Sequence, residues 1–120
     1  MTAEHNGWGI GLDARSTTTS APLDVTVVNS VAAHNVNQGY FSGSGSGHPT
    51  ASLVLRNVSA SHNSEGVYAF GTGAIVRLAH SVVAGNTNKA TDVYGGGVIY
   101  SYGDNEIDVT ASGLTAATLQ

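Results

Sequence analysis

A histidine–asparagine pair occurs three times in this chain of 120 residues, which contains only five histidines. The pairs are His5 with Asn6, His34 with Asn35, and His62 with Asn63. Imidazole is a common ligand for zinc, copper and nickel, so one hypothesis is a surface metal site made by the three histidines. Metal ligands must converge at about 2 Å from one ion, whereas side chains on adjacent strands start about 4.8 Å apart and run parallel. Exposed turn histidines are therefore the competing interpretation.

A second group of candidate residues lies near the end of the sequence. Asp104, Glu106 and Asp108 alternate along one segment, which places them on the same side if that segment is extended. Two carboxyl groups roughly 5 to 9 Å apart are what glycoside hydrolysis requires. Arg77 is the candidate base for the alternative, a polysaccharide lyase. The same spacing is also typical of an ordinary solvent-facing strand, so catalysis stays one of two interpretations.

Aromatic residues cluster in the segments that follow the repeated asparagines. Exposed rings of this kind could stack on sugars, which makes them candidate glycan-binding residues. They could equally form a ladder of aromatic side chains inside the coil or half-buried on its surface. The candidates are Trp8, Tyr40, Tyr68, Tyr100 and Tyr102.

The asparagines reveal an internal repeat, which is the main signal in the sequence. Asn6, Asn35, Asn63 and Asn86 are separated by 29, 28 and 23 residues. Aligning them superimposes residues 25–35, 53–63 and 76–86 without a gap. Apolar residues alternate in each unit, as in strands that bury one face.

Each repeat is predicted to hold three short strands. A glycine-containing run follows each asparagine, at residues 7–12, 39–43, 66–71 and 95–103, while segments 13–22, 42–50 and 87–94 are predicted to be loops. Such units bury their inner faces only when stacked, each strand pairing in parallel with its counterpart one coil away. The sequence therefore predicts an all-β fold, a right-handed parallel β-helix of about four coils, in a single domain spanning residues 1–120.

The repeated asparagines are predicted to form a ladder at one bend of this coil. A side-chain amide can donate to one coil and accept from the other, satisfying main-chain groups that the bend leaves free. Asn6, Asn35, Asn63 and Asn86 are the predicted members.

The repeat pattern and the segment 95–107, GGGVIYSYGDNEI, resemble the last coils of bacterial right-handed parallel β-helix repeat proteins of the pectin-lyase-like superfamily. The resemblance implies a truncated or C-terminal set of coils from a family whose members are often exported or cell-surface proteins. That superfamily includes lyases, polygalacturonases, adhesins and tailspikes, so it implies no single reaction. No acidic cluster accompanies Arg77 or Arg56, and the local patterns typical of polygalacturonases are missing from the sequence.

Composition narrows the range of partners. Charged residues make up 10% of the chain, the net charge is −4, and the four basic residues are scattered, which disfavours nucleic acid. The sequence contains no apolar run long enough for a membrane span, no signal-peptide pattern and no cysteine, and no residue pattern calls for a cofactor. Because the first and last coils look incomplete and uncapped, we expect a homo-oligomer formed through open coil ends or a flat side.

Three functions follow from these observations. The leading hypothesis is a non-catalytic β-helix module with a structural, self-associating or glycan-binding role, for which a polysaccharide is the candidate ligand. The first alternative is a polysaccharide lyase or glycoside hydrolase, and the second is metal binding by the histidine column.

Overall fold

The computed structural model describes residues 1–17 and 19–117, and this part of the chain folds into β-strands joined by turns and loops. None of the described residues belongs to a helix of the length and apolarity that a membrane span requires. The strands are β1 (Thr2–Glu4), β2 (Ile10–Asp13), β3 (Leu23–Ala33), β4 (Gln38–Gly43), β5 (Ala51–Ser61), β6 (Glu65–Phe70), β7 (Ala74–Ala79), β8 (Val82–Val83), β9 (Lys89–Tyr94), β10 (Val98–Tyr102), β11 (Glu106–Ile107) and β12 (Leu114–Ala117).

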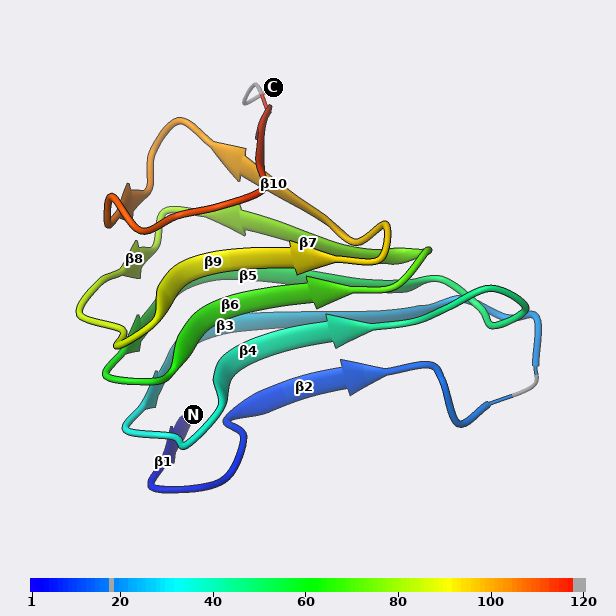
Figure 1. The fold of residues 1–120 in the computed structure, drawn as a ribbon, viewed down its shortest axis with the longest axis horizontal. Helices are drawn as coiled ribbons and strands as arrows, with labels where there is room; N and C mark the ends of the chain where they lie inside the picture. The colour runs from blue at the N-terminus through cyan, green and yellow to red at the C-terminus, as the bar shows by residue number, and fades with distance from the viewer. Residues whose placement is uncertain (18, 118–120) are drawn as a thin grey trace.

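The strands form a parallel β-solenoid of about four turns, which confirms the predicted fold class (Figure 1). One sheet has the order β1-β3-β5-β7-β10-β12, with β8 paired to β5 and β11 paired to β8; we call it the rear sheet. The other has the order β2-β4-β6-β9; we call it the front sheet. Each strand pairs in parallel with the strand one turn away, so neighbours in space are distant in sequence.

Each full turn contains three strand segments, as the repeat predicts. In the rear sheet β3 and β5 each run for 11 residues but bend in the middle, at Asn29 and Asn57, where φ is 51° and 52°. The next turns divide at the same place, into β7 with β8 and into β10 with β11. One full turn therefore runs along the rear-sheet strand through its bend at Asn29 or Asn57. It then passes the second bend at the His–Asn pair and ends with the front-sheet strand.

Inward-facing residues of the rear sheet stack in register to form the core. Leu53 pairs with Val76, while the neighbouring column aligns Val27 with Leu55 and Leu78. The Leu53, Leu55, Val76 and Leu78 side chains are fully buried, which confirms the alternation seen in the sequence. Full burial of each such side chain contributes about 1.5–3 kcal/mol.

The prediction of a loop at residues 87–94 is wrong. Most of this segment is strand β9, which pairs with β6 and extends the front sheet. Its inward residues are small or polar, including Ala90 and Thr91, so the segment lacks the alternation of large apolar residues that marks the other strands. Thr91 is buried without penalty because its hydroxyl donates to Ser112 O at 3.0 Å.

The run at residues 95–103 is also placed differently from the prediction. It does not follow the fourth asparagine as a front-sheet strand. Instead it forms the turn into β10, which pairs with β7 in the rear sheet, with Ile99 beside Val76. Strand β9 takes the front-sheet position that the sequence assigns to residues 95–103.

Candidate functional site

Three of the four repeated asparagines form a hydrogen-bonded column at the bend that precedes the front sheet. Asn35 Nδ2 donates to Asn63 Oδ1 at 2.9 Å, and Asn63 Nδ2 donates to Asn86 Oδ1 at 3.2 Å. Each Oδ1 also accepts the main-chain N–H of the asparagine one turn earlier, at 3.0–3.1 Å. Asn6 takes part through its main-chain N–H, while its side chain is exposed and makes no hydrogen bond within the described residues.

The glycines that follow the asparagines make room for this column. The second Nδ2 hydrogen of each buried asparagine donates to a main-chain carbonyl, for example Asn63 Nδ2 to Ala32 O at 3.0 Å. A Cβ atom on Gly39 would lie 2.6 Å from Asn63 Nδ2, and one on Gly66 would lie 2.8 Å from Asn86 Nδ2. A side chain at either position would push the ladder amide away from its partners.

The histidines occupy a left-handed backbone position beside each asparagine. The φ angles of His5, His34 and His62 are 58°, 55° and 56°. Histidine is one of the few non-glycine residues enriched in this region, and the fourth turn has Gly85 there, with φ of 71°. The repeated pair is thus a bend in which the first residue adopts the left-handed turn and the second faces inward.

The three imidazoles stack face to face on the surface. The ring centroids of His5 and His34 are 5.3 Å apart and those of His34 and His62 are 4.7 Å apart, with planes inclined by 8° and 12°. Ring nitrogens in parallel stacked planes do not point to a common centre. Within residues 1–17 and 19–117 no three His, Cys, Asp or Glu side chains are grouped so that they could hold a metal ion.

Two of the acidic candidates near the end of the chain, Asp104 and Asp108, accept main-chain hydrogen bonds at bends one turn earlier. Asp104 Oδ1 accepts the main-chain N–H of His80 at 2.9 Å, and Asp108 Oδ2 accepts that of Gly85 at 2.7 Å. The hydrogen bond from the His80 main chain lowers the pKa of the Asp104 carboxyl. Both carboxylates therefore cap residues in the left-handed conformation one turn earlier.

Only part of the candidate catalytic set lies together. Asp104 and Glu106 border a shallow depression of about 240 Å³, which neither Asp108 nor Arg77 lines. Arg77 instead lies on the rear sheet, where Nη1 donates to a serine hydroxyl at 3.1 Å and the guanidinium carbon is 5.5 Å from the centroid of the Tyr100 ring. The structure does not assemble these four residues into one site.

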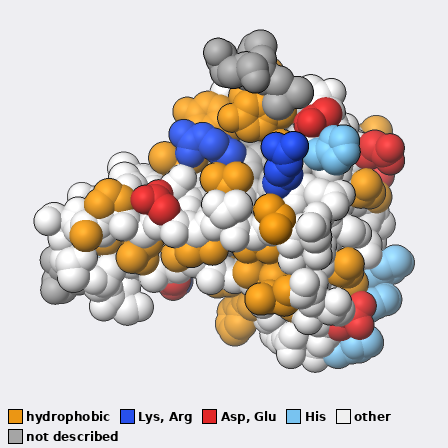
Figure 2. All heavy atoms as spheres, turned by 180° about the vertical axis from the view of Figure 1, so that it is seen from behind, with side chains coloured by type: hydrophobic (Ala, Val, Ile, Leu, Met, Phe, Trp, Pro, Cys, Tyr) orange, Lys and Arg blue, Asp and Glu red, His pale blue; other side chains and the backbone are white. Residues whose placement is uncertain are grey.

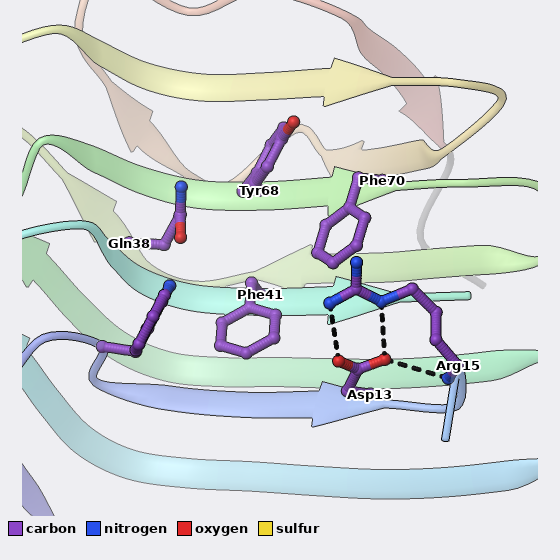
Figure 3. Close-up of a pocket in the computed structure, with 7 residues that line it drawn as sticks. Asp13, Arg15, Gln38, Phe41, Tyr68 and Phe70 are labelled. Atoms are coloured by element: carbon purple, nitrogen blue, oxygen red, sulfur yellow. Dashed lines mark hydrogen bonds and ion pairs between the residues drawn. The ribbon is translucent and has the colours of Figure 1, made fainter. Parts of the chain in front are cut away.

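A larger groove lies on the outer face of the front sheet, with a volume of about 490 Å³ (Figure 3). Its residues come from β2, β4 and β6 and from the segments on either side of β2. They are Trp8, Asp13, Arg15, Gln38, Phe41, Tyr68 and Phe70.

Two phenylalanines of this groove lie over glycines of the preceding turn. A Cβ atom on Gly11 would lie 2.1–2.7 Å from three ring carbons of Phe41, and one on Gly43 would lie 2.4–2.9 Å from three ring carbons of Phe70. In Figure 3 the Phe41 ring is seen face-on against the sheet. The glycines therefore let the rings lie flat, so that one aromatic face packs on the backbone and the other is directed away from it.

A paired arginine covers one end of the groove. Arg15 donates to Asp13 through Nε at 2.9 Å and through Nη2 at 2.8 Å, and its guanidinium carbon lies 4.3 Å from the centroid of the Phe70 ring. The hydrogen bond from Arg15 lowers the pKa of the Asp13 carboxyl. At the other end Gln38 Nε2 donates to Glu65 Oε1 at 2.6 Å.

The candidate glycan-binding residues are divided by the fold. Trp8, 56% exposed, and Tyr68 line the groove, whereas Tyr100 and Tyr102 lie on β10 in the rear sheet. The prediction that Tyr40 binds a glycan is wrong. Its side chain is 0% exposed and its hydroxyl donates to Ser59 O at 3.4 Å, so no ligand reaches it.

Sequence reasoning missed most of the groove. Trp8 and Tyr40 are both candidates from the aromatic clusters, but they do not occupy equivalent positions, because Tyr40 pairs with Ile10. The informative signal was the column that aligns Gly11, Phe41 and Tyr68, in which a glycine in one turn precedes an aromatic residue in the next. The same signal recurs where Gly43 pairs with Phe70.

Comparison with known proteins adds no family to these findings. No family model, curated protein or solved structure matches the chain. The parallel β-helix is therefore the part of the resemblance that the structure supports.

Proposed function

We propose that this protein is a non-catalytic glycan-binding module that holds a saccharide in the groove of the front sheet. The observation that carries the proposal is the Phe41 ring, which lies flat over Gly11 and presents an aromatic face in the groove. Flat aromatic surfaces bind the apolar C–H faces of pyranose rings, because both surfaces lose contact with water when they stack.

The remaining groove residues supply what a sugar needs besides an apolar floor. Trp8 and Tyr68 add aromatic surface beside Phe41, while Gln38 and the Asp13–Arg15 pair add hydrogen-bonding groups. Ligand sites typically combine apolar walls with a few fixed polar groups in a volume of about 300–1,000 Å³. The groove has this composition and falls within that range, at about 490 Å³.

The polar groups of the groove favour binding over catalysis. Among the described residues that line the groove, Asp13 alone carries a carboxyl group, and its pKa is lowered by Arg15, so it stays ionised at neutral pH. Glycoside hydrolysis requires a second carboxyl group, one of the two protonated to act as the general acid. Asp104 and Glu106 border a different depression and do not supply it. Glu65 lies beside the groove but is not among its lining residues, and its Oε1 accepts the Gln38 Nε2 hydrogen bond at 2.6 Å.

A glycan array followed by titration calorimetry tests the proposal. Replacing Phe41→Ala should weaken binding by about three- to tenfold, since covering one face of the ring contributes about half of the roughly 1.5–3 kcal/mol of full burial. Trp8→Ala is the companion variant, because the exposed Trp8 side chain can be removed with little effect on folding.

Tyr100→Ala is the matched control, since Tyr100 lies on the rear sheet and should not affect binding. Equal losses from Tyr100→Ala and Phe41→Ala would place the ligand elsewhere, and an array without any bound glycan would refute the proposal. Release of reducing or unsaturated ends from a bound polysaccharide would support the enzyme alternative instead.

A further inference from the structure

We infer that the groove selects uncharged glycans and discriminates against polyuronates. This inference rests on the proposed function and assigns the ligand class of the same site. It depends on three features of the front sheet: an arginine already engaged, a pair of carboxyl groups at the opposite border, and the distribution of the other basic residues.

Arg15 is the one cation among the described residues that line the groove, and it is already paired. Arg15 directs Nε and Nη2, the fork that would recognise a ligand carboxylate, at the two oxygens of Asp13, at 2.9 and 2.8 Å. The Asp13 oxygen also accepts the Arg15 main-chain N–H at 2.9 Å, which fixes the pair further. A uronate could take this arginine only by displacing Asp13, and the displaced carboxylate would remain in the groove as a like charge.

Carboxyl groups border the groove beside Tyr68. Asp92 is the register partner of Tyr68 one turn later, and Glu65 lies on the same strand and is bonded to Gln38 at 2.6 Å. The pKa of the Tyr68 hydroxyl is raised, first by burial and then by the negative charges of Glu65 and Asp92. The hydroxyl at the rim of the groove therefore lies in a negative potential.

The nearby cations do not outweigh these acids. Lys89 Nζ lies 3.6 Å from Asp92 Oδ1 and so compensates one of them. Three carboxylates (Asp13, Glu65, Asp92) against two cations (Arg15, Lys89) leave a net charge of −1 around the groove.

The other two basic residues lie away from the groove. Arg56 and Arg77 alternate with the buried Leu55 and Leu78 in the rear sheet, so they point outward from that sheet. Figure 2, the view from behind, shows Lys and Arg side chains on that face. Within the described part of the chain, no cation without a carboxylate partner borders the groove.

The experiment compares glycans that differ only in charge. The probes are cellohexaose and galactohexaose, each set against the same hexamer oxidised at C6 to the uronate, together with the full array of neutral and uronic glycans. We expect the neutral form of a binding pair to be held about tenfold more tightly at low salt, which is the size expected for several surface charge contacts. The preference should shrink in 1 M NaCl, where the screening length falls to about 3 Å.

Asp92→Asn tests the cause of the preference. Removing this charge should lower the neutral-to-uronate affinity ratio by about threefold, because each surface charge contact is worth roughly a factor of a few. Asp24→Asn is the control, since it makes the same change in net charge at an exposed position on β3 in the rear sheet and should leave the ratio unchanged.

The outcomes separate the two proposals. Uronates bound as tightly as their neutral counterparts, or dominating the bound set on the array, would overturn the inference and leave the glycan-binding function standing. A ratio that Asp24→Asn changes as much as Asp92→Asn would also overturn it, because the preference would then reflect overall charge. Absence of binding to every glycan would instead refute the proposed function.

Discussion

The replacement Asn63→Ala should destabilise this protein more than most substitutions of a single polar residue. Asn63 is fully buried and makes four side-chain hydrogen bonds. Its Oδ1 accepts from Asn35 N and Nδ2 at 3.0 and 2.9 Å, and its Nδ2 donates to Ala32 O at 3.0 Å and to Asn86 Oδ1 at 3.2 Å. The substitution removes all four bonds at the centre of the solenoid.

The magnitude follows from the groups left without partners. The Asn35 N–H and the Ala32 carbonyl lose the hydrogen bonds that Asn63 makes to them. A buried polar group without a partner costs about 1–3 kcal/mol, so the two groups together predict a loss of about 2–6 kcal/mol in the free energy of unfolding. That is a large part of the roughly 5–15 kcal/mol by which a folded domain is typically stable.

Urea unfolding followed by circular dichroism in the β-sheet region measures this loss. Asn63→Asp should be at least as damaging, because it keeps the size of the side chain but turns a carboxylate oxygen toward Ala32 O and Asn86 Oδ1. Asn6→Ala is the matched control from the same column of the sequence, and since its side chain is exposed we expect a change within about 0.5 kcal/mol. A loss below about 1 kcal/mol for Asn63→Ala would refute the view that the ladder stabilises the stacked turns.

Three further predictions concern the front sheet and the histidine bend. Burial, and then the neighbouring Asp92 carboxyl, raise the pKa of Glu65, so the folded state binds this proton more tightly than the unfolded state does. The free energy of unfolding should therefore rise as pH falls from neutral through that pKa. Glu65→Gln should raise the thermal midpoint at pH 7 but not at pH 4, and an equal shift at both pH values would contradict this. At the left-handed position of His62, His62→Gly should be neutral or stabilising and His62→Val should cost about 1–2 kcal/mol in chemical unfolding, because a β-branched residue is strained there; equal stabilities would show that the side chain, not the backbone, sets this position. Gly43→Val should displace the Phe70 ring, since even a Cβ atom would lie 2.4 Å from it, and should lower both the thermal midpoint and glycan affinity; unchanged binding would show that this ring does not shape the groove.

The coil could be predicted from the sequence because stacked turns place equivalent residue types at a nearly constant spacing. Residues that meet in space, such as Asn35 and Asn63, are one turn apart in sequence, so the ladder and the core columns recur at nearly the same interval. Strand β9 could not be predicted because its inward side chains, including Thr91, are small or carry a hydroxyl group. A buried hydroxyl with a hydrogen-bond partner leaves no alternation of large apolar residues in the sequence.

The orientation of adjacent aromatic residues needed the three-dimensional structure. Tyr40 and Phe41 are neighbours on β4, so alternation requires one to face inward and the other outward, but the bend before the strand decides which. The structure buries Tyr40 and places Phe41 in the groove. Tyr40, a candidate binding residue in the sequence, is therefore a core residue, and Phe41 takes its place in the groove.

The amino-acid sequence by itself determined the parallel β-helix and the turns that repeat it, because these depend on residues equivalent from one turn to the next. It also marked the histidines, whose repetition follows from the left-handed backbone that precedes each asparagine. Only the tertiary structure decided where a ligand could bind. The groove combines side chains from three successive turns, and their juxtaposition depends on the register between strands and on glycines that let a ring from the next turn lie flat.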